Sequence, residues 1–312
     1  MNEAVHDPRT PRPAETGSLW EHLKNDRRTL AFVFLLPTMV VLISVVIYPF
    51  FFALLISMQT KMAGSPGKFV GLANYFELFR ASEFGRVVYN TVFYTFFAVA
   101  IKFTIGLAAA LVLNQPRRFN NIYRTILFIP WAVPTVIASL NWLWVYDEFS
   151  GMLNHLFLAM GLSDNVIAWL AEPHLAMWAV IAVVVWNGTP FYTMHFLAGL
   201  QAIPRELYEA ADIDGAGHVQ QFWHITIPSM MTVFTITVML STVFTSTSIV
   251  VVNILTNGAP ANLTQILPNY SYGLAIETGR LGIGSAVNVI FFPLLVIFII
   301  LLTRRMLRRD GA

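Results

Sequence analysis

The sequence predicts an all-α polytopic membrane protein with six transmembrane helices, and three observations support this fold class. Of the 312 residues, 56% are hydrophobic and only 12% are charged, whereas soluble domains have about 25% charged residues. The mean hydropathy of the chain is +0.64. Six apolar stretches are each long enough to cross a hydrocarbon core of about 30 Å, which takes roughly 20 helical residues.

The six predicted spans cover about residues 31–57, 88–113, 126–146, 173–199, 229–253 and 283–303. Each is expected to be helical, because in lipid any other backbone form would leave amide and carbonyl groups unpaired. They make residues 31–303 the predicted transmembrane domain. Residues 1–30 precede it as a tail, and the basic segment 304–312 follows it.

The positions of Lys and Arg predict the orientation, because these residues are enriched in cytoplasmic loops. With the N-terminus inside, 13 of the 19 Lys and Arg residues fall in inward segments and five in outward segments, while Lys102 lies within a span. Both termini are therefore expected in the cytoplasm. The longest inward loop is then 200–228, between the fourth and fifth spans.

The first 30 residues lack the apolar core of a cleavable signal peptide and contain three prolines. Residues 1–18 are expected to form a disordered tail. The stretch SLWEHLKNDRRT is predicted to be a short interfacial helix or, equally well, a solvated leader.

Several classes of chemistry are disfavoured by what the sequence lacks. It has no cysteine, no GxxxxGK[ST] phosphate loop and no HExxH, and its seven histidines lack metal-ligand spacing. GIGSA around Ser285 lacks the strand that precedes a nucleophile turn. No catalytic, cofactor or metal site is therefore expected. No Asp or Glu falls in a predicted span, which weakens an ion-driven carrier without removing that alternative.

The inward loop RELYEAADIDGAGHVQQFWHITIP is unusually polar for its surroundings. Pro204 suits the first turn of a helix, which is predicted to run through about Asp212. The glycines of 215–217 allow a reversal. A second short helix is predicted over about 218–226, with Pro228 restarting the chain as the fifth span. The loop is thus predicted to be a helix–turn–helix projection suited to docking in a groove of a partner.

Residues EAADIDGAGHVQQFWHITIP resemble the EAA loop of the permease subunits of binding-protein-dependent ABC importers. The pattern is E-A-A, two residues, D-G-A, eight residues and I-x-L-P, and Ile227 replaces the leucine here. The resemblance covers about residues 35–303 and is strongest to the carbohydrate branch, with maltose and glycerol-3-phosphate permeases. FVGLANY at 69–75, FIPW at 128–131 and AGLQAIPRELYEAA at 198–211 support it. LTNGAP at 255–260 departs from the usual LTxGGP by placing Ala259 at the second glycine.

The resemblance implies a type I importer permease of the bacterial inner membrane. Two permeases would form the pore, two cytoplasmic ABC ATPases would bind ATP and Mg and grip the loops, and an external binding protein would deliver a carbohydrate. The expected partner in the pore is a second permease of different sequence. Membrane lipid is expected to surround the spans, and no nucleic acid partner is expected. The residues assigned to ATPase coupling are Glu209, Ala210, Ala211, Asp214, Gly215 and Ala216. A loop that merely folds stably is the alternative for these residues, and a secondary carrier or channel for a small polar solute is the alternative function.

Polar and aromatic residues within the spans are candidates for the solute path. Ser241, Thr245 and Ser248 share one face of the fifth span. The remaining candidates are Trp186, Asn187, Tyr192, Lys102 and Asn141. Alternatives stay open for all of them, because membrane Ser and Thr often bond back to their own helix and polar residues join packed helices. Lys102 is expected to extend toward the membrane surface or to bond to carbonyls of a neighbouring helix rather than to face a cavity.

Overall fold

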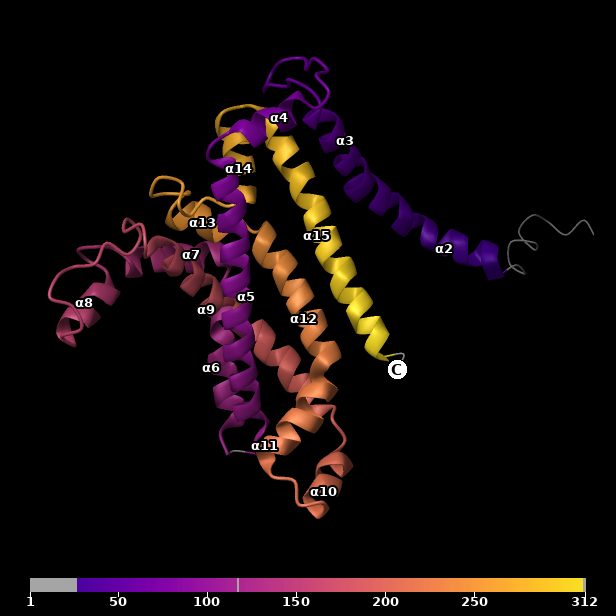
Figure 1. The fold of residues 1–312 in the computed structure, drawn as a ribbon, viewed down its shortest axis with the longest axis vertical. Coiled ribbons are helices and arrows are strands. Elements are labelled where there is room, and N and C mark those ends of the chain that lie inside the picture. Colours follow the sequence, from indigo (N-terminus) through magenta and orange to yellow (C-terminus); the bar gives the residue numbers. More distant parts are fainter. Residues whose placement is uncertain (1–26, 117, 311–312) are drawn as a thin grey trace, which may run out of the picture. The chain divides into compact units, whose positions relative to one another are not determined.

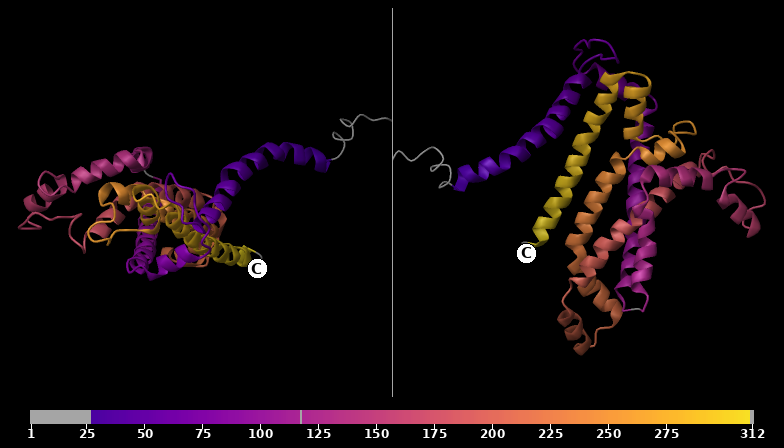
Figure 2. Two further views of the ribbon diagram at one scale, coloured as in Figure 1. Left: turned by 90° about the horizontal axis from the view of Figure 1, so that it is seen from above. Right: turned by 180° about the vertical axis from the view of Figure 1, so that it is seen from behind.

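The computed structural model describes residues 27–116 and 118–310, and side chains for 29–116 and 118–306. These residues form helices joined by loops (Figures 1 and 2), which confirms the all-α fold class. The predicted disordered tail and most of the predicted interfacial helix lie outside the described residues. The chain divides into two compact units, Met1–Ala53 and Leu54–Ala312.

The helical region at the start of the described chain consists of α2 (Arg27–Leu42), a π-helical turn (Ile43–Ile47) and α3 (Tyr48–Ser57). In the π turn the Tyr48 amide donates to the Ile43 carbonyl. The wider turn comes directly before Pro49, which has no amide and whose ring would crowd the preceding turn of a regular α-helix. The helix continues to Ser57 and is apolar enough to cross a membrane.

The second unit holds the remaining helices of the described chain. Their bounds are α4 (Ala73–Arg80), α5 (Phe84–Asn114), α6 (Asn120–Ala132), α7 (Thr135–Val145), α8 (Met152–Ala159), α9 (Ala176–Gln201), α10 (Arg205–Ile213), α11 (His218–Gln221), α12 (Ile227–Thr247), α13 (Val250–Leu255), α14 (Leu267–Tyr272) and α15 (Leu281–Asp310), with π turns at Phe222–Thr226 and Gly273–Glu277.

Five helices among the described residues are long and apolar enough to cross a membrane: Thr29–Ser57, Phe84–Asn114, Ala176–Gln201, His218–Leu255 and Leu281–Met306. The predicted third span, 126–146, is not one straight helix. It consists of α6 and α7, which meet at a bend of 92°. Pro134 causes the break, because it lacks an amide and holds Val133 in an extended conformation with ψ 126°.

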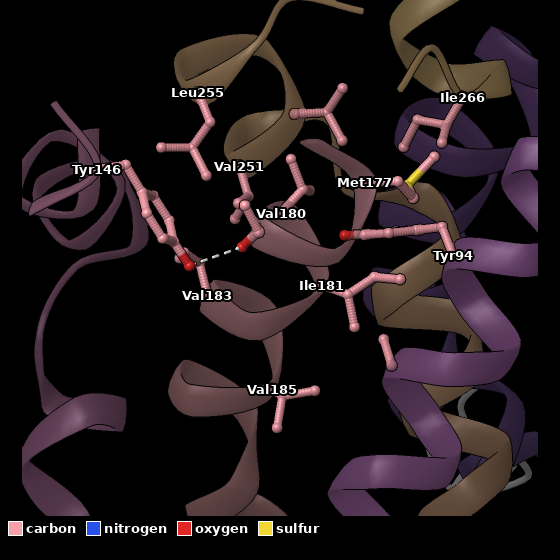
Figure 3. Packing of buried hydrophobic residues seen from close by; sticks show 13 residues of the cluster. Tyr94, Tyr146, Met177, Val180, Ile181, Val183, Val185, Val251, Leu255 and Ile266 are labelled. Carbon is pink, nitrogen blue, oxygen red and sulfur yellow. Dashed lines mark hydrogen bonds between the residues drawn. The ribbon is translucent and has the colours of Figure 1, made fainter. Parts of the chain in front are cut away.

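The centre of the second unit is the packing of α5 against α9, with α12 and α13 beside them (Figure 1). Figure 3 shows one apolar cluster of this core, in which Tyr94, Val180 and Val252 are almost fully buried. The Tyr146 hydroxyl donates to the Ala179 carbonyl at 3.1 Å. Further along the same interface Gly106 lies against the Tyr192 side chain, where a Cβ would collide. A small residue therefore lets these two helices approach closely, as is common in membranes.

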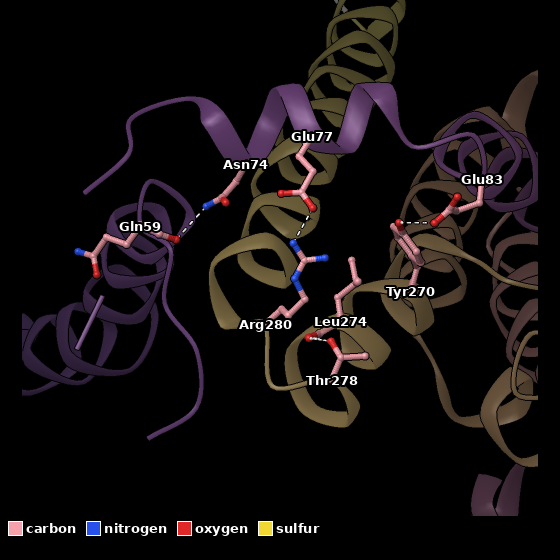
Figure 4. A network of polar contacts seen from close by, with 8 residues as sticks. All are labelled: Gln59, Asn74, Glu77, Glu83, Tyr270, Leu274, Thr278 and Arg280. Atoms are coloured by element: carbon pink, nitrogen blue, oxygen red, sulfur yellow. Dashed lines mark hydrogen bonds and ion pairs between the residues drawn. The ribbon is translucent and has the colours of Figure 1, made fainter. Parts of the chain in front are cut away.

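The end of the unit that holds α4 and α14 is joined by polar contacts (Figure 4). Asn74 is buried and donates to the carbonyls of Ser57 and Gln59 at 2.7 and 2.9 Å. The Tyr270 hydroxyl donates to Glu83 at 3.4 Å. Burial, followed by the negative charge of Glu83, raises the pKa of Tyr270 to about 12, so the hydroxyl keeps its proton at neutral pH. These bonds fix the loops at this end of the helices.

Candidate functional site

The polar loop between α9 and α12 begins with α10, which follows Pro204 and has Glu206 in its first turn, where a negative charge is favoured. The helix ends in a Schellman motif. The Gly215 amide donates to the Asp212 carbonyl at 3.1 Å, and the Ala216 amide to the Ala211 carbonyl at 2.9 Å. Gly215 has φ +77°, a left-handed conformation that glycine adopts without steric cost.

The second half of the loop corrects one expectation. Pro228 does not restart the chain, because α11, the π turn Phe222–Thr226 and α12 form one continuous helix from His218. In the π turn the Ile227 amide donates to the Phe222 carbonyl, five residues back. The widened turn accommodates Pro228 without a break, as the π turn before Pro49 does. The second half of the loop is therefore continuous with the fifth span.

Two side-chain hydrogen bonds hold α10 against this long helix, Gln221 to Asp212 and Tyr208 to Thr226. Gln221 donates through Nε2 to Asp212 at 2.5 Å and to the Ala216 carbonyl at 3.1 Å. Tyr208 and Thr226 share a hydroxyl–hydroxyl bond of 2.8 Å. Sequence reasoning missed these bracing roles. One signal was present, since Tyr208 and Asp212 are four residues apart and so lie on one face of α10.

The residues assigned to coupling gather on this loop. Glu209, Ala210, Asp214 and Gly215 are exposed, while Ala211 and Ala216 are half-buried. A surface hollow of about 420 Å³ is lined by Ala211, Asp214, Gly215, Ala216, Gln220, Gln221, His224 and Ile225. Ile213 beside it is 87% exposed and Val219 73% exposed. A braced projection that combines acidic, small and exposed apolar side chains has the surface of a docking element.

A second feature is a cavity of about 310 Å³ within the helices. It brings together five of the eight residues predicted for a solute path, namely Lys102, Asn187, Ser241, Thr245 and Ser248. Aromatic side chains complete much of its wall: Tyr94, Trp131, Phe191 and Phe244. Sequence reasoning missed these four. Helical spacing could have found two, since Phe191 follows Asn187 by four residues and Phe244 follows Ser241 by three.

The other three predicted residues do not line this cavity. Trp186 lines a separate apolar cavity and its ring makes an edge contact with Trp142. Tyr192 is fully buried in the core, packed edge-on against Phe196. Asn141 is exposed on α7. Trp186 and Tyr192 therefore pack between helices, which is the alternative that the sequence left open for them.

Two helix breaks border the cavity. Residues on both sides of the α6–α7 bend, Trp131 and Thr135, line it, and so does Ser248 just after the end of α12. In a continuous helix the Pro130 carbonyl would accept from residue 134, but Pro134 has no amide. The Asn187 side chain takes that place and donates to the Pro130 carbonyl at 2.7 Å. Irregular backbone at membrane depth is tolerated where it lines a cavity and is satisfied in this way.

Lys102 corrects another expectation, because it does not extend toward the membrane surface. Its side chain is 4% exposed and its Nζ donates to Thr245 Oγ1 at 2.7 Å. The Tyr192 ring centroid lies 5.9 Å from Nζ. Gly188 makes room for the lysine stem, since a Cβ there would lie 2.7 Å from Lys102 Cδ. Within the described chain the ammonium thus bonds to a hydroxyl and not to a backbone carbonyl.

The hydroxyl residues of α12 divide into two groups. Thr235, Thr237 and Thr247 donate to carbonyls of their own helix four residues earlier, as expected for membrane threonines that have a local role. Thr245 instead accepts from Lys102 across the cavity wall. The hydroxyl of Thr245 thereby ties the fifth span to α5 at the cavity.

A helical membrane protein with a broken-helix cavity and a projecting loop on its fifth span has the architecture of a permease. The family model described as "Binding-protein-dependent transport system inner membrane component" matches residues 102–309. The trehalose/maltose transport system permease protein MalF of Thermococcus litoralis is 35% identical over 295 residues, which cover 94% of this chain and 99% of that protein. The chain therefore belongs to the inner membrane components of binding-protein-dependent transport systems, which are permeases and not themselves enzymes.

Two further comparisons agree. The arabinooligosaccharides transport system permease protein AraP of Bacillus subtilis is 29% identical over 301 residues, covering 92% of this chain and 95% of that protein. The fold is similar to a chain in the crystal structure of a bacterial ABC transporter involved in alginate import. The TM-score is 0.80 and the identity 20%, with 93% of this chain and 98% of that chain covered. The chain is thus a multi-pass membrane protein with the fold of an ABC importer permease.

Proposed function

We propose that this chain is a pore-forming permease subunit of an ATP-driven carbohydrate uptake system, and that it moves solute by alternating access. The observation that carries the proposal is the docking loop, which is rigidly braced and continuous with the fifth span. A force applied to α10 is transmitted through Gln221 and Thr226 to a helix that reaches the cavity at Ser241 and Thr245.

The motor in this proposal is a pair of separate ABC ATPase subunits, which bind ATP and Mg. Glu209, Ala210 and Asp214 are exposed for contact with them, and Ala211, Gly215 and Ala216 form the hollow behind. Nucleotide binding would move the loop as a rigid body and bias a two-state equilibrium of the helices. In this proposal the loop lies on the cytoplasmic side, and so do both chain termini, as the distribution of Lys and Arg predicts.

The solute path in this proposal is the cavity of about 310 Å³. Hydroxyl, amide and ammonium groups offer hydrogen bonds to a polyhydroxylated ligand, and the faces of Trp131, Phe191 and Phe244 suit the apolar faces of sugar rings. The names of relatives support a carbohydrate solute. They name trehalose/maltose, arabinooligosaccharides and sulfoquinovosyl glycerol, the last for a protein of Agrobacterium fabrum that is 32% identical over 274 residues.

The working assembly would contain a second permease, an extracytoplasmic solute-binding protein and the two ATPases. A second permease of different sequence is favoured, since the resemblance is to the carbohydrate branch. In this proposal the partner permease contributes the rest of the cavity wall.

Reconstitution of the complex tests the proposal. The chain is co-expressed with the proteins encoded beside it, placed in liposomes, and assayed for uptake of labelled oligosaccharides with ATP inside. We expect uptake that requires ATP, the ATPases and the binding protein. Uphill uptake by the chain without an ATPase would contradict the proposal and identify a secondary carrier.

A further inference from the structure

The cavity holds a buried lysine side chain that no acidic residue of its described wall pairs with. Lys102 is 4% exposed, and none of the residues that line the cavity in the described chain is Asp or Glu. An ammonium has three donors, and one of them is given to Thr245. The remaining hydrogen-bonding capacity of Lys102 is available to whatever enters the cavity.

The site around this lysine is built rather than incidental. Thr245 fixes Nζ at 2.7 Å, and the absence of a side chain at Gly188 leaves space for the lysine stem. Asn187 is held beside it by its bond to the Pro130 carbonyl. These contacts come from α9, α12 and the end of α6, so the Lys102 side chain on α5 is positioned by several elements.

Energetics favour an anionic ligand over a neutral one. Burial disfavours the charged form of a lysine that has no counter-ion, and a neutral amide side chain would hydrogen-bond to sugar hydroxyls without that cost. A negative group on the solute would recover much of the cost, because opposite charges attract strongly where water is excluded. The aromatic wall then serves the uncharged rings of the same molecule.

We propose that the solute of this permease is a carbohydrate that carries an acidic group, and that Lys102 binds this group in the cavity. The inference rests on the proposed function and narrows it from carbohydrates in general to anionic ones such as uronates or sulfonated sugars. The anion would take the free donors of Lys102 while its hydroxyls reach Asn187 and Ser241.

Equilibrium dialysis on the purified permease–ATPase complex tests this without the binding protein, which would impose its own selectivity. The probes are labelled pairs in which a carboxylate replaces one hydroxymethyl group: glucuronate and glucose, and cellobiouronate and cellobiose. We expect the complex to bind an acid about tenfold or more tightly than its neutral twin, the effect of a charge-assisted hydrogen bond. Lys102→Gln is expected to remove this preference, whereas Lys68→Gln, at an exposed position, keeps it.

Thr245→Val provides a second variant in case Lys102→Gln does not assemble. It removes the acceptor that fixes Nζ and is expected to weaken acid binding several-fold, while Thr245→Ser preserves it. Thr247→Val is the matched control, because Thr247 is exposed on the same helix and bonds only to its own backbone. Size-exclusion profiles and melting temperatures show which variants are folded.

Three outcomes would overturn the inference: equal or weaker binding of every acid, no acid binding at all, or an acid preference that survives Lys102→Gln in a folded complex. If the complex bound and took up only neutral sugars, the proposed function would be supported and only the inference of an anionic solute would be refuted. Uptake of no sugar of either kind would remove both.

Discussion

Gly215 offers a sharp test of the loop, because the nearby Gly217 shares its uncrowded surroundings but not its left-handed backbone. A Cβ built on Gly215 or on Gly217 meets no atom within 4 Å, so neither position is crowded. Gly215 has φ +77°, whereas Gly217 has φ −70° and ψ 162°. Substitution by alanine therefore separates backbone conformation from packing.

The expected cost follows from the left-handed conformation. An L-residue at such a position costs about 1–2 kcal/mol, so Gly215→Ala is expected to raise the opening of the α10 terminus about 5- to 30-fold. Gly217→Ala is expected to change the stability of the loop by under about 1 kcal/mol, because the restriction of the unfolded chain is offset by the poorer N-cap preference of alanine at this position. Gly215→Pro combines an incompatible φ with loss of the hydrogen bond that the Gly215 amide donates to the Asp212 carbonyl. It is expected to abolish uptake while leaving membrane insertion intact.

Hydrogen exchange measures the first two effects directly. The amides of Gly215 and Ala216, which donate to Asp212 and Ala211, are followed in the parent and in each alanine variant, with α5 peptides as an internal reference. ATP-dependent uptake and co-purification of the ATPase are measured on the same preparations. Parent-like exchange in Gly215→Ala, or equal damage from Gly217→Ala, would refute the conformational reasoning. Normal uptake and ATPase retention in Gly215→Pro would show that the loop is not the coupling element.

Further predictions concern the cavity and the loops. Asn187→Leu leaves the Pro130 carbonyl without its hydrogen bond and is expected to destabilise the complex by about 1–3 kcal/mol, measured as a lower melting temperature. An unchanged melting temperature would show that the hydrogen bond from Asn187 to Pro130 does not stabilise the α6–α7 bend. Arg280→Gln is expected to lower the stability of the complex by under about 1 kcal/mol, because the ion pair with Glu77 is exposed. Asn74→Leu is expected to lower it more, because Asn74 is buried and donates to two carbonyls. A lower melting temperature for Arg280→Gln than for Asn74→Leu would contradict this order. The backbone amide and the hydroxyl of Ser150, then the backbone amide of Phe149, donate to the Asp147 carboxylate and lower its pKa. The turn is therefore most stable above pH about 4 and is expected to loosen as the pH falls through the lowered pKa. Asp147→Asn is expected to loosen the turn in the same way at neutral pH, measured as reduced hydrogen-exchange protection of these amides.

The apolar stretches and the loop motif could be predicted from the sequence because both are local. A run of about 20 apolar residues prefers lipid wherever it lies in the fold, and the glycines of 215–217 permit a reversal through their own backbone freedom. The family resemblance rested on the same loop. The positions of Ser241, Thr245 and Ser248 on one helical face likewise follow from the helical repeat.

The bend between α6 and α7 could have been suspected from Pro134, but its size depends on what satisfies the freed carbonyl. That partner is Asn187, 57 residues further along the chain. The unbroken passage through Pro228 depends on a π turn, which no residue pattern in the loop specifies. Local signals therefore gave proline positions without deciding which of them would break a helix.

The sequence by itself determined that the chain is a helical membrane protein, which segments are apolar, and where a polar loop interrupts them. Only the tertiary structure decided which polar side chains meet. Hydropathy measures transfer of a segment from water to lipid and is insensitive to the rotation of one helix against another. That rotation brings Lys102 to Thr245 in a cavity whose described lining has no Asp or Glu, and it leaves Tyr192 buried in the packing beside it.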